Sequence, residues 1–446
     1  MKLSVRRALL LKSLSPKFLL STGLVSLTAT LALVSHSSAI PPTLQDSPKA
    51  VIEEAWQIVN REYVDPTFNR NDWQAVRQTL LKPDYKNTKE AYDALRLALK
   101  KLEDPYTRFM DPQQFESLNS QTSGELSGVG IRLESKEITK QLTVVEPLAN
   151  SPAIKAGVRS GDELIAIDGK PTKGMTVEDA SSKIRGKAGT PVTLRIRRSE
   201  EGEFNLNLTR ARIELVTVRY NLRNEGGKPI GYLRLNEFSS HAADQMRNAL
   251  KDLIKQDAQG FVLDLRGNPG GLLQASIEIS RMWLDKGGIV KTVDRQGSSE
   301  EVSANRTALT QRPMVVLVDG NSASSSEILT GALKDNKRAT IVGTQTFGKA
   351  LVQSVYPLPD KSGLAVTIAH YYTPNGTDIS HKGIAPDVVV ALTEEQGKIL
   401  SKNPKLIATM DDPQYAKAVQ IIQGTANIAG NETQKASQGG SPKPVQ

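Results

Sequence analysis

The chain has 446 residues, more than one ordinary hydrophobic core can organise, so we expect two or three domains. It contains no cysteine, which excludes thiol nucleophiles, cysteine-bound metals and disulfides. Lys and Arg outnumber Asp and Glu by nine, but five of the basic residues lie in residues 1–39, which hold no acidic residue. The small remaining net charge and the absence of a basic run argue against nucleic acid as a partner.

The first 39 residues have the pattern of a secretory signal. Basic residues precede an apolar run over residues 18–34, and Ser37 and Ala39 place small side chains at positions −3 and −1 of a cleavage site. We therefore expect export and cleavage after Ala39. A retained membrane anchor is the alternative, because the apolar run is close to the shortest length that spans a bilayer.

The pattern then changes several times along the chain. Residues 49–118 repeat apolar side chains at helical spacing and predict a small helical domain. Residues 120–200 read as short strands with glycine turns and one helix, which is a sensible size for a single module. Residues 396–423 predict a helical segment, and the polar residues 424–446 predict a disordered tail.

Residues 201–395 form the largest predicted domain, with alternating strands and helices from residue 228 onward. The continuous apolar runs 261–265 and 314–318 are typical of buried strands, and residues 242–255 are amphipathic at helical spacing. Alternation of this kind predicts βαβ units around a largely parallel sheet, so the fold class is α/β.

A serine cluster, Ser322-Ala323-Ser324-Ser325-Ser326-Glu327, follows the strand predicted at 314–318. A strand that turns sharply into a helix places the turn at the carboxyl edge of the sheet, where free N–H groups and the positive end of the helix stabilise an oxyanion. Ser324-x-x-Glu327 is also a capping box, and that motif alone favours the cap. The two roles use the same position and are compatible.

The histidines do not supply a base for such a serine. G-x-S-x-G is absent, and none of His36, His241, His370 and His381 lies beside a nucleophile-elbow pattern. We expect each histidine to be a surface or packing residue. A serine nucleophile in this chain would need another base, and lysine is the known substitute.

Two glycine-rich turns accompany the serine cluster. Residues 343–349 match the first part of a phosphate-binding loop, but Ala350 replaces its Ser or Thr and a strand pattern follows instead of a helix, so we exclude nucleotide binding. The simpler reading is a tight turn that presents Lys349. Residues 264–271 end the strand at 261–265 and could aim a second N–H group at the carbonyl of a substrate, although a plain turn would look the same.

These segments resemble the carboxyl-terminal processing proteases, also called tail-specific proteases, over about residues 50–395. The matching motifs are Asp104-Pro105-Tyr106-Thr107, Asp264 to Gly271, Gly320 to Glu327, Thr346 to Lys349 and Gly383 to Asp387. The segments at residues 281–287 and 372–379 resemble those of the photosynthetic branch, which includes the cyanobacterial and plastid proteins. The resemblance implies an N-terminal helical unit, a PDZ-like domain and a crotonase/ClpP-like serine peptidase core.

The resemblance also implies roles for single residues. Ser324 matches the family nucleophile, Lys349 its base, and Gln353 the glutamine that orients the lysine. The backbone N–H groups of Gly270 and Ser325 match the oxyanion donors. Ser325 departs from the alanine expected there, which should matter little because the donor is a backbone group.

A lysine that acts as a base must be neutral, so its surroundings must lower its pKa. Phe347, Leu351 and Val352 could provide an apolar environment for the Lys349 amine. Gln353 could hold that amine without adding a negative charge. No cofactor and no metal is implied.

The stretch Gly128-Val129-Gly130-Ile131 resembles the carboxylate-binding turn and edge strand of a PDZ domain, which capture a peptide tail by strand addition. The implied partners are proteins or peptides with free C-termini, in the periplasm or the thylakoid lumen, with peripheral membrane association as a further expectation. The alternative is a non-enzymatic, PDZ-based tail-binding scaffold with an inactive protease core.

Overall fold

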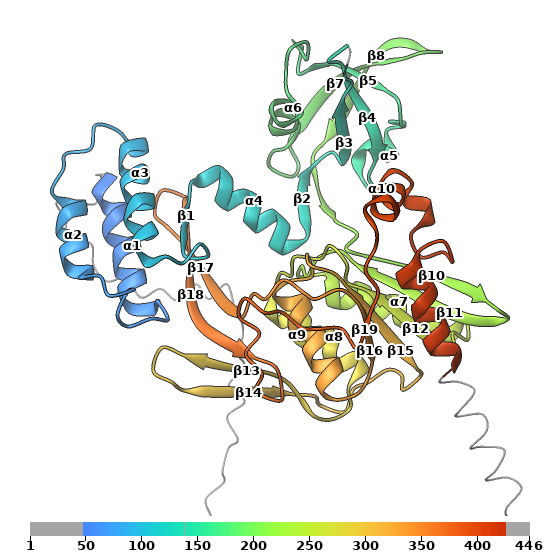
Figure 1. Cartoon of the computed structure of the whole chain (residues 1–446). Helices are drawn as coiled ribbons and strands as arrows, with labels where there is room; N and C mark the ends of the chain where they lie inside the picture. The colour runs from blue at the N-terminus through green and yellow to red at the C-terminus, as the bar shows by residue number, and fades with distance from the viewer. Residues whose placement is uncertain (1–47, 138, 425–446) are drawn as a thin grey trace, which may run out of the picture.

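A computed structural model describes residues 48–137 and 139–424 (Figure 1). The predicted signal at 1–39 and all but the first residue of the predicted tail at 424–446 lie outside the described residues. A helical unit, a small β-rich lobe and a larger central domain are visible, and the helical unit and the lobe stand on different sides of the central domain. None of the helices in the described ranges has the length and apolar character needed to cross a membrane.

The helical unit is built around buried aromatic rings. Phe68 stacks on Trp73 with ring centroids 5.4 Å apart, and the indole N–H of Trp56 donates to the carbonyl of Trp73. The same hydrophobic cluster includes Leu364 and Val366 of the central domain, so the unit is fixed to that domain by apolar contact. Its elements are α1 (Pro48–Glu62), α2 (Trp73–Leu81), α3 (Thr88–Leu99) and η1 (Lys100–Leu102), followed by β1 (Arg108–Met110) and α4 (Pro112–Ser123).

The β-rich lobe is the predicted PDZ domain. Its sheet has the order β3-β4-β5-β7-β8 with β6 beside β5, and the two-stranded ribbon β2–β9 joins it to the central domain (Figure 1). Strand β8 lies beyond the boundary predicted at residue 200 and pairs with β7 along its whole length. The elements are β2 (Glu125–Gly128), β3 (Ile131–Ser135), β4 (Leu142–Pro147), α5 (Pro152–Lys155), β5 (Glu163–Ile167), β6 (Lys170–Pro171), α6 (Val177–Ile184), β7 (Pro191–Arg198), β8 (Gly202–Thr209) and β9 (Ala211–Glu214).

The central domain confirms the predicted α/β class. Its six-stranded sheet has the order β10-β11-β12-β15-β16-β19, and every neighbouring pair is parallel except β10–β11. The elements of this sheet and its helices are β10 (Val218–Glu225), β11 (Lys228–Leu235), α7 (Ala242–Lys255), β12 (Gly260–Asp264), α8 (Leu273–Trp283), β15 (Met314–Val318), α9 (Ser325–Asp335), β16 (Thr340–Gly343) and β19 (Val388–Val389).

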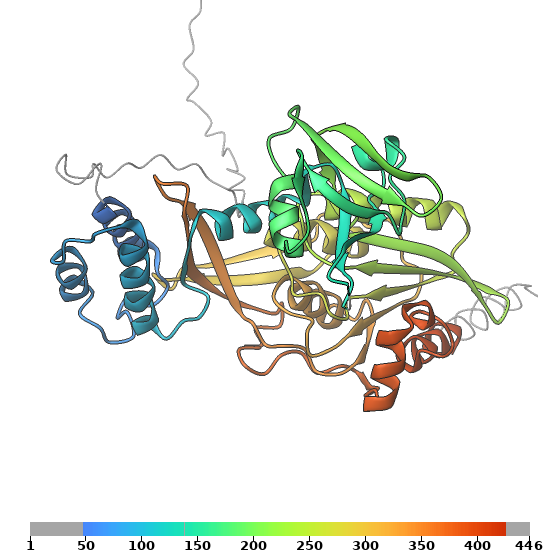
Figure 2. The same cartoon turned by 90° about the horizontal axis from the view of Figure 1, so that it is seen from above.

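Both faces of this sheet are covered, which explains why its strands are apolar throughout. Helices α7, α8 and α9 bury one face in the main hydrophobic cluster. The other face, which includes Tyr232 and Val262, packs against the C-terminal residues Tyr415, Val419 and Ile422 (Figure 2). These residues belong to a helix over 413–424 that follows α10 (Glu394–Lys402) and η2 (Pro404–Leu406).

A second sheet, in which every strand pair is antiparallel, was not predicted from the sequence. It has the order β1-β18-β13-β14, and β17 pairs with the opposite edge of β18. Its members from the central domain are β13 (Gly288–Asp294), β14 (Ser299–Ser303), β17 (Leu351–Pro357) and β18 (Gly363–Tyr372). Because Arg108 pairs with Ala365, the end of the helical unit lies beside the strands that follow Lys349.

A buried ionic network joins the C-terminal segment to the end of β12. The Arg266 guanidinium donates to both Asp264 and Asp412, at 2.7 and 2.8 Å for its Nη2 atom, and also to Gln414. Both carboxylates are fully buried, and the neighbouring positive charge lowers the pKa of Asp264 against the effect of burial. The network therefore holds in place the residue at which the glycine-rich turn 267–271 begins.

Candidate active site

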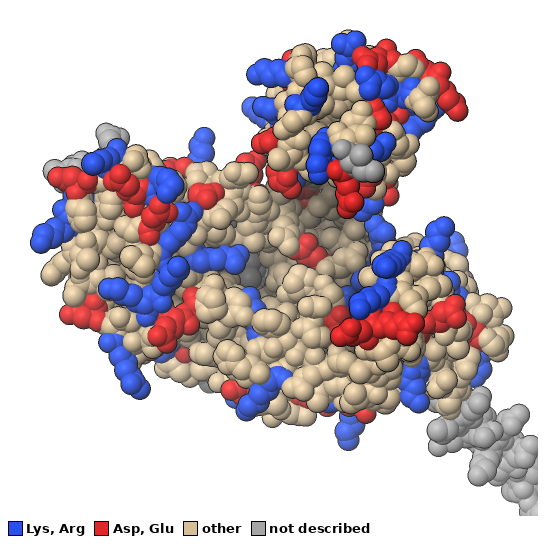
Figure 3. Space-filling view, turned by 45° about the horizontal axis from the view of Figure 1, so that its top comes forward, with Lys and Arg blue, Asp and Glu red and all other residues tan. Residues whose placement is uncertain are grey.

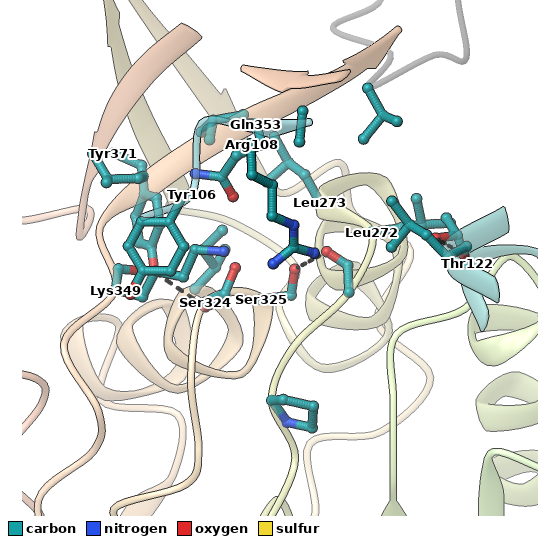
Figure 4. Close-up of a pocket in the computed structure, with 18 residues that line it drawn as sticks. Tyr106, Arg108, Thr122, Leu272, Leu273, Ser324, Ser325, Lys349, Gln353 and Tyr371 are labelled. Carbon is teal, nitrogen blue, oxygen red and sulfur yellow. Dashed lines mark hydrogen bonds between the residues drawn. The ribbon is translucent and has the colours of Figure 1, made fainter. Parts of the chain in front are cut away.

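The predicted catalytic residues line one cavity beside the carboxyl ends of the parallel strands. Ser324, Lys349 and Gln353 contribute to its wall, together with Tyr106 and Arg108 from the segment that leads into β1 (Figure 4). Figure 3 shows that this face of the molecule is hollowed between the PDZ lobe and the central domain. The structure thus gathers residues from the helical unit, the strand-to-helix turn and β17 in one place.

Ser324 occupies a strained turn between β15 and α9. Its backbone angles are φ 53° and ψ −116°, a conformation that a residue with a side chain rarely adopts and that costs on the order of 1–3 kcal/mol. Gly270 makes room for this turn, because a Cβ atom at Gly270 would lie 2.9 Å from the Cβ atom of Ser324. The two predicted turns therefore touch each other, which requires glycine at position 270.

The four serine hydroxyls of the cluster differ in what they bind. Those of Ser322, Ser325 and Ser326 each donate to a backbone carbonyl at 2.9 Å, of Leu265, Gly271 and Asn268 in turn. The Ser324 side chain takes part in the predicted capping box at the start of helix α9, but its hydroxyl donates to no atom of the described residues and Ser324 is only half-buried. Of the four serines, Ser324 is the one whose hydroxyl is left for a substrate.

Glu327 ties the serine turn to the lysine turn. Its fully buried carboxylate accepts hydrogen bonds from the backbone N–H groups of Ser324 (2.9 Å), Gly348 (2.7 Å) and Lys349 (2.9 Å). The Thr346 hydroxyl donates to it at 2.6 Å. The predicted capping interaction of Glu327 with the backbone of Ser324 is therefore present, and it also holds Lys349 at a fixed separation from Ser324.

The Lys349 amine lies in an environment that favours its neutral form. Burial is the main cause, and the positive charge of Arg108 adds to it, so the pKa of Lys349 falls to about 8. Its Nζ atom lies 4.4 Å from the centre of the Tyr106 ring. Leu351 and Val352 line the cavity as expected, but Phe347 is 54% exposed and is absent from the cavity lining, so that expectation was wrong.

Gln353 lies in the cavity wall without the predicted contact. Its Nε2 atom is buried and has no hydrogen-bond partner among the described residues. No hydrogen bond joins Gln353 to Lys349, or Lys349 to the Ser324 hydroxyl, in this part of the chain. Catalytic hydrogen bonds are often long before substrate binds. Because Gln353 and Lys349 line the same cavity, their predicted roles as orienting residue and base can be tested by mutation.

The two predicted oxyanion donors differ in whether their N–H groups already donate a hydrogen bond. Ser325 starts helix α9, and its N–H group donates to no atom of the described residues, while its hydroxyl donates to the carbonyl of Gly271. The Gly270 N–H donates to Oδ1 of Asn268 at 2.9 Å. Gly270 can serve a substrate only if the Asn268 side chain releases this hydrogen bond.

Sequence reasoning assigned no function to three residues that shape the site. Tyr106 covers the lysine amine, and Arg108 reaches down toward Ser324 and Ser325 (Figure 4). The hydroxyl of Tyr371 contacts the carbonyl oxygens of Ser324 and Lys349. The motif at 104–107 includes Tyr106 and directly precedes Arg108, so it could have drawn attention to both residues. Their place in the cavity, however, depends on the pairing of β1 with β18, which the local sequence pattern does not reveal.

Comparison with known proteins identifies the family. The sequence profile of Peptidase family S41 matches residues 229–390, and a PDZ-domain profile matches residues 143–198. A carboxyl-terminal-processing protease of Picosynechococcus sp. is 45% identical over 372 residues, which cover 83% of this chain and 90% of that protein. The chain belongs to the carboxyl-terminal processing proteases.

Plastid and structural relatives agree with this assignment. Carboxyl-terminal-processing peptidase 2, chloroplastic, of Arabidopsis thaliana is 39% identical over 388 residues, covering 82% of this protease and 74% of that protein. The structure of a photosystem II D1 C-terminal processing protease is 36% identical, with a TM-score of 0.52 and coverage of 83% and 99%. The resemblance to the photosynthetic branch is thereby confirmed.

Family membership makes this protease a serine-type peptidase and decides against the inactive scaffold. The three described histidines, His241, His370 and His381, are absent from the cavity lining, as expected if none of them is the base. His241 instead contacts Glu125 at the ribbon that joins the PDZ domain, with its Nε2 atom 3.2 Å from the carboxylate.

The predicted tail-binding turn lies at the edge of the PDZ sheet. Val129 is buried, Gly130 has φ +79°, and a Cβ atom at Gly130 would lie 2.3 Å from the Cβ atom of Ser151. The turn, Gly128 to Ile131, leads directly into β3, which is an edge strand of the PDZ sheet next to α6. An edge strand carries unpaired backbone groups to which an extended peptide can be added.

Proposed function

We propose that this protease cleaves exported proteins near their C-termini, with Ser324 as the nucleophile and Lys349 as the general base. The observation that carries the proposal is the Ser324 hydroxyl, which faces the cavity from a strained turn while its neighbours are hydrogen-bonded to the backbone. The lowered pKa of Lys349, about 8, supports the second part, because a useful fraction of the amine is neutral near pH 7–8.

In the proposed reaction the Ser324 hydroxyl oxygen attacks the carbonyl carbon of the scissile bond, and its proton passes to the neutral Lys349 amine. The backbone N–H of Ser325 stabilises the oxyanion, with the help of the positive end of helix α9. Lys349 then returns the proton to the departing amine, which leaves an ester on Ser324. A water molecule gives its proton to Lys349 and its oxygen forms a bond to the ester carbon. The ester bond to Ser324 then breaks, Lys349 returns the proton to the Ser324 oxygen, and the new C-terminal carboxyl group is released.

The PDZ domain is proposed to hold the tail of the substrate. The turn at 128–131 and the free edge of β3 together offer N–H groups for a terminal carboxylate and a strand edge for the residues before it. Capture of the tail would place the chain upstream of it across the hollow that leads to Ser324.

A peptide with a free C-terminal carboxylate should bind more tightly than its amidated form, by about tenfold or more, because the amide loses a charge-assisted interaction. Binding of the two peptides to the full-length Ser324→Ala protein can be measured by fluorescence anisotropy, without turnover. Equal affinity for acid and amide would contradict capture of the terminal carboxylate, and it would leave the chemistry at Ser324 a separate question.

We also propose that the protein is exported, to the periplasm or the thylakoid lumen. The support is the signal-like pattern of residues 1–39 and the chloroplastic proteins among its relatives. Mature protein recovered from a periplasmic or luminal fraction should begin at Ile40. A chain recovered with residues 1–39 attached, from the membrane fraction alone, would instead indicate the retained anchor.

A further inference from the structure

Arg108 is a cation without a partner at the mouth of the catalytic cavity. Its side chain is exposed and makes no hydrogen bond or ion pair with any residue in the described ranges. Figure 4 shows the guanidinium reaching from β1 toward Ser324 and Ser325. Arg96 in the same helical unit, by contrast, forms an ion pair with Asp111.

The backbone that carries Arg108 is held firmly, so its direction is a property of the fold. The Asp104 carboxylate accepts hydrogen bonds from the Tyr106 N–H at 2.9 Å and from the hydroxyls of Thr107 and Thr367 at 2.7 and 2.6 Å. Arg108 then pairs with Ala365 across the β1–β18 ladder. The backbone thus directs the Arg108 side chain to the cavity, and its planar guanidinium matches the geometry of a planar anion.

The rest of the cavity wall near Arg108 is apolar or neutral apart from Lys349. Leu118 and Leu272 line it, and no carboxylate of the described residues is part of the lining. A peptide that crosses this cavity meets the Arg108 guanidinium, whose donors are unused among the described residues, beside the reacting serine. The group that matches such donors is a carboxylate, which can accept two parallel hydrogen bonds.

We propose that Arg108 is a specificity-determining residue that binds an acidic side chain of the substrate within a few residues of the scissile bond. This inference rests on the proposed function, because the position of Ser324 defines where the scissile bond lies. It assigns to the helical unit a part in substrate choice, separate from recognition of the tail by the PDZ domain.

The charge of Arg108 also acts on the base, which gives a second readout. Repulsion from Arg108 contributes to the lowered pKa of Lys349. A substrate carboxylate bound to Arg108 offsets that repulsion, so the pKa of Lys349 rises in the complex. The pH profile of kcat should therefore lie at higher pH for an acidic substrate than for its neutral counterpart.

The test uses peptides with one free-acid tail and one cleavage site. A single Asp is placed in turn at each of the three positions on either side of the scissile bond, and each peptide has an Asn counterpart. The wild-type protein should prefer Asp to Asn at one or more positions by about tenfold in kcat/KM, as expected for a hydrogen bond to a charged group. Arg108→Gln should reduce that ratio to about one, and Arg108→Lys should retain part of it.

Lys100→Gln is the matched control. Lys100 lies in the same helical unit and is exposed, but it is absent from the wall of the catalytic cavity, so its variant loses one positive charge and should keep the preference for Asp. If Arg108→Gln lowered the turnover of both peptides equally, the cause would be the loss of its effect on the pKa of Lys349. Only the ratio between Asp and Asn peptides reports recognition.

Two results would overturn the inference. One is a ratio near one at all six positions in the wild type, and the other is a preference for Asp that survives in Arg108→Gln. If no peptide is cleaved, the proposed function fails, but the inference is still decided by binding. Ser324→Ala should then bind the preferred Asp peptide more tightly than the Asn peptide, and the double variant with Arg108→Gln should not.

Discussion

Replacement of Ser324 by alanine is expected to lower kcat by at least 10⁴-fold, on the scale of the loss of a nucleophile in other serine peptidases. The reason is that the alanine variant cannot form the ester through which the peptide bond is broken. Its fold should be retained, because the Ser324 hydroxyl donates to no atom of the described residues and loss of its part in the capping box costs only about 1 kcal/mol. Cleavage of a tail-bearing peptide, followed by mass spectrometry, measures the effect directly.

The neighbouring serines provide the controls for this prediction. Ser322→Ala and Ser326→Ala each remove a buried hydroxyl that donates to a backbone carbonyl, so they should cost roughly 1–3 kcal/mol in the free energy of unfolding and keep much of the activity. Ser325→Ala should also remain active, because the proposed donor at this position is the backbone N–H. An active Ser324→Ala protein together with an inactive Ser326→Ala protein would show that the nucleophile was misassigned.

Lys349→Arg is expected to be inactive, although it preserves a positive charge and nearly the same length. A guanidinium stays protonated at any working pH and cannot accept the proton of the Ser324 hydroxyl. Lys349→Ala would be less informative, since its loss of activity is also explained by lost packing against Tyr106. Near-normal turnover by Lys349→Arg would show that only a positive charge is needed and would exclude the Ser–Lys mechanism.

The pH dependence of the wild type follows from the same residue. The lowered pKa of Lys349 means that the amine is protonated and inactive below about pH 8 and neutral above it. The rate should therefore rise with pH through an apparent pKa of about 8, which is well below the value of about 10.4 for a free lysine. A profile that is flat between pH 6 and pH 9 would contradict a neutral amine as the base.

The sequence was sufficient to predict the parts of the site that depend on local pattern. Buried strands at 261–265 and 314–318 were recognisable from apolar runs, and each was followed by a turn with glycine or serine, so the serine cluster at 322–326 could be placed at the edge of the sheet. The choice of Ser324 within that cluster came from the resemblance to the family. The failed phosphate-loop match indicated a tight turn that presents Lys349, and the resemblance to the family assigned this lysine its role as the base. These inferences needed only neighbours in the sequence.

The parts that were missed depend on contacts between distant segments. Nothing in the pattern around Arg108 indicates that it pairs with Ala365, so the contribution of the helical unit to the cavity could not be foreseen. Phe347 was assigned to the surroundings of Lys349 because it lies two residues away, but the turn directs it to solvent. The hydrogen bond from Gly270 to Asn268 depends on one side-chain rotamer, which sequence does not specify.

The pairing of early and late segments has a consequence for the order of synthesis. Tyr106 and Arg108 reach the cavity only when β1 adds to β18, and the turn at 267–271 is anchored through Arg266 only when Asp412 has arrived. A growing chain therefore emerges with its serine and lysine present but the surrounding wall incomplete. Because contacts between distant segments are slow to form, we expect peptidase activity to appear only after the C-terminal segment has folded onto the sheet.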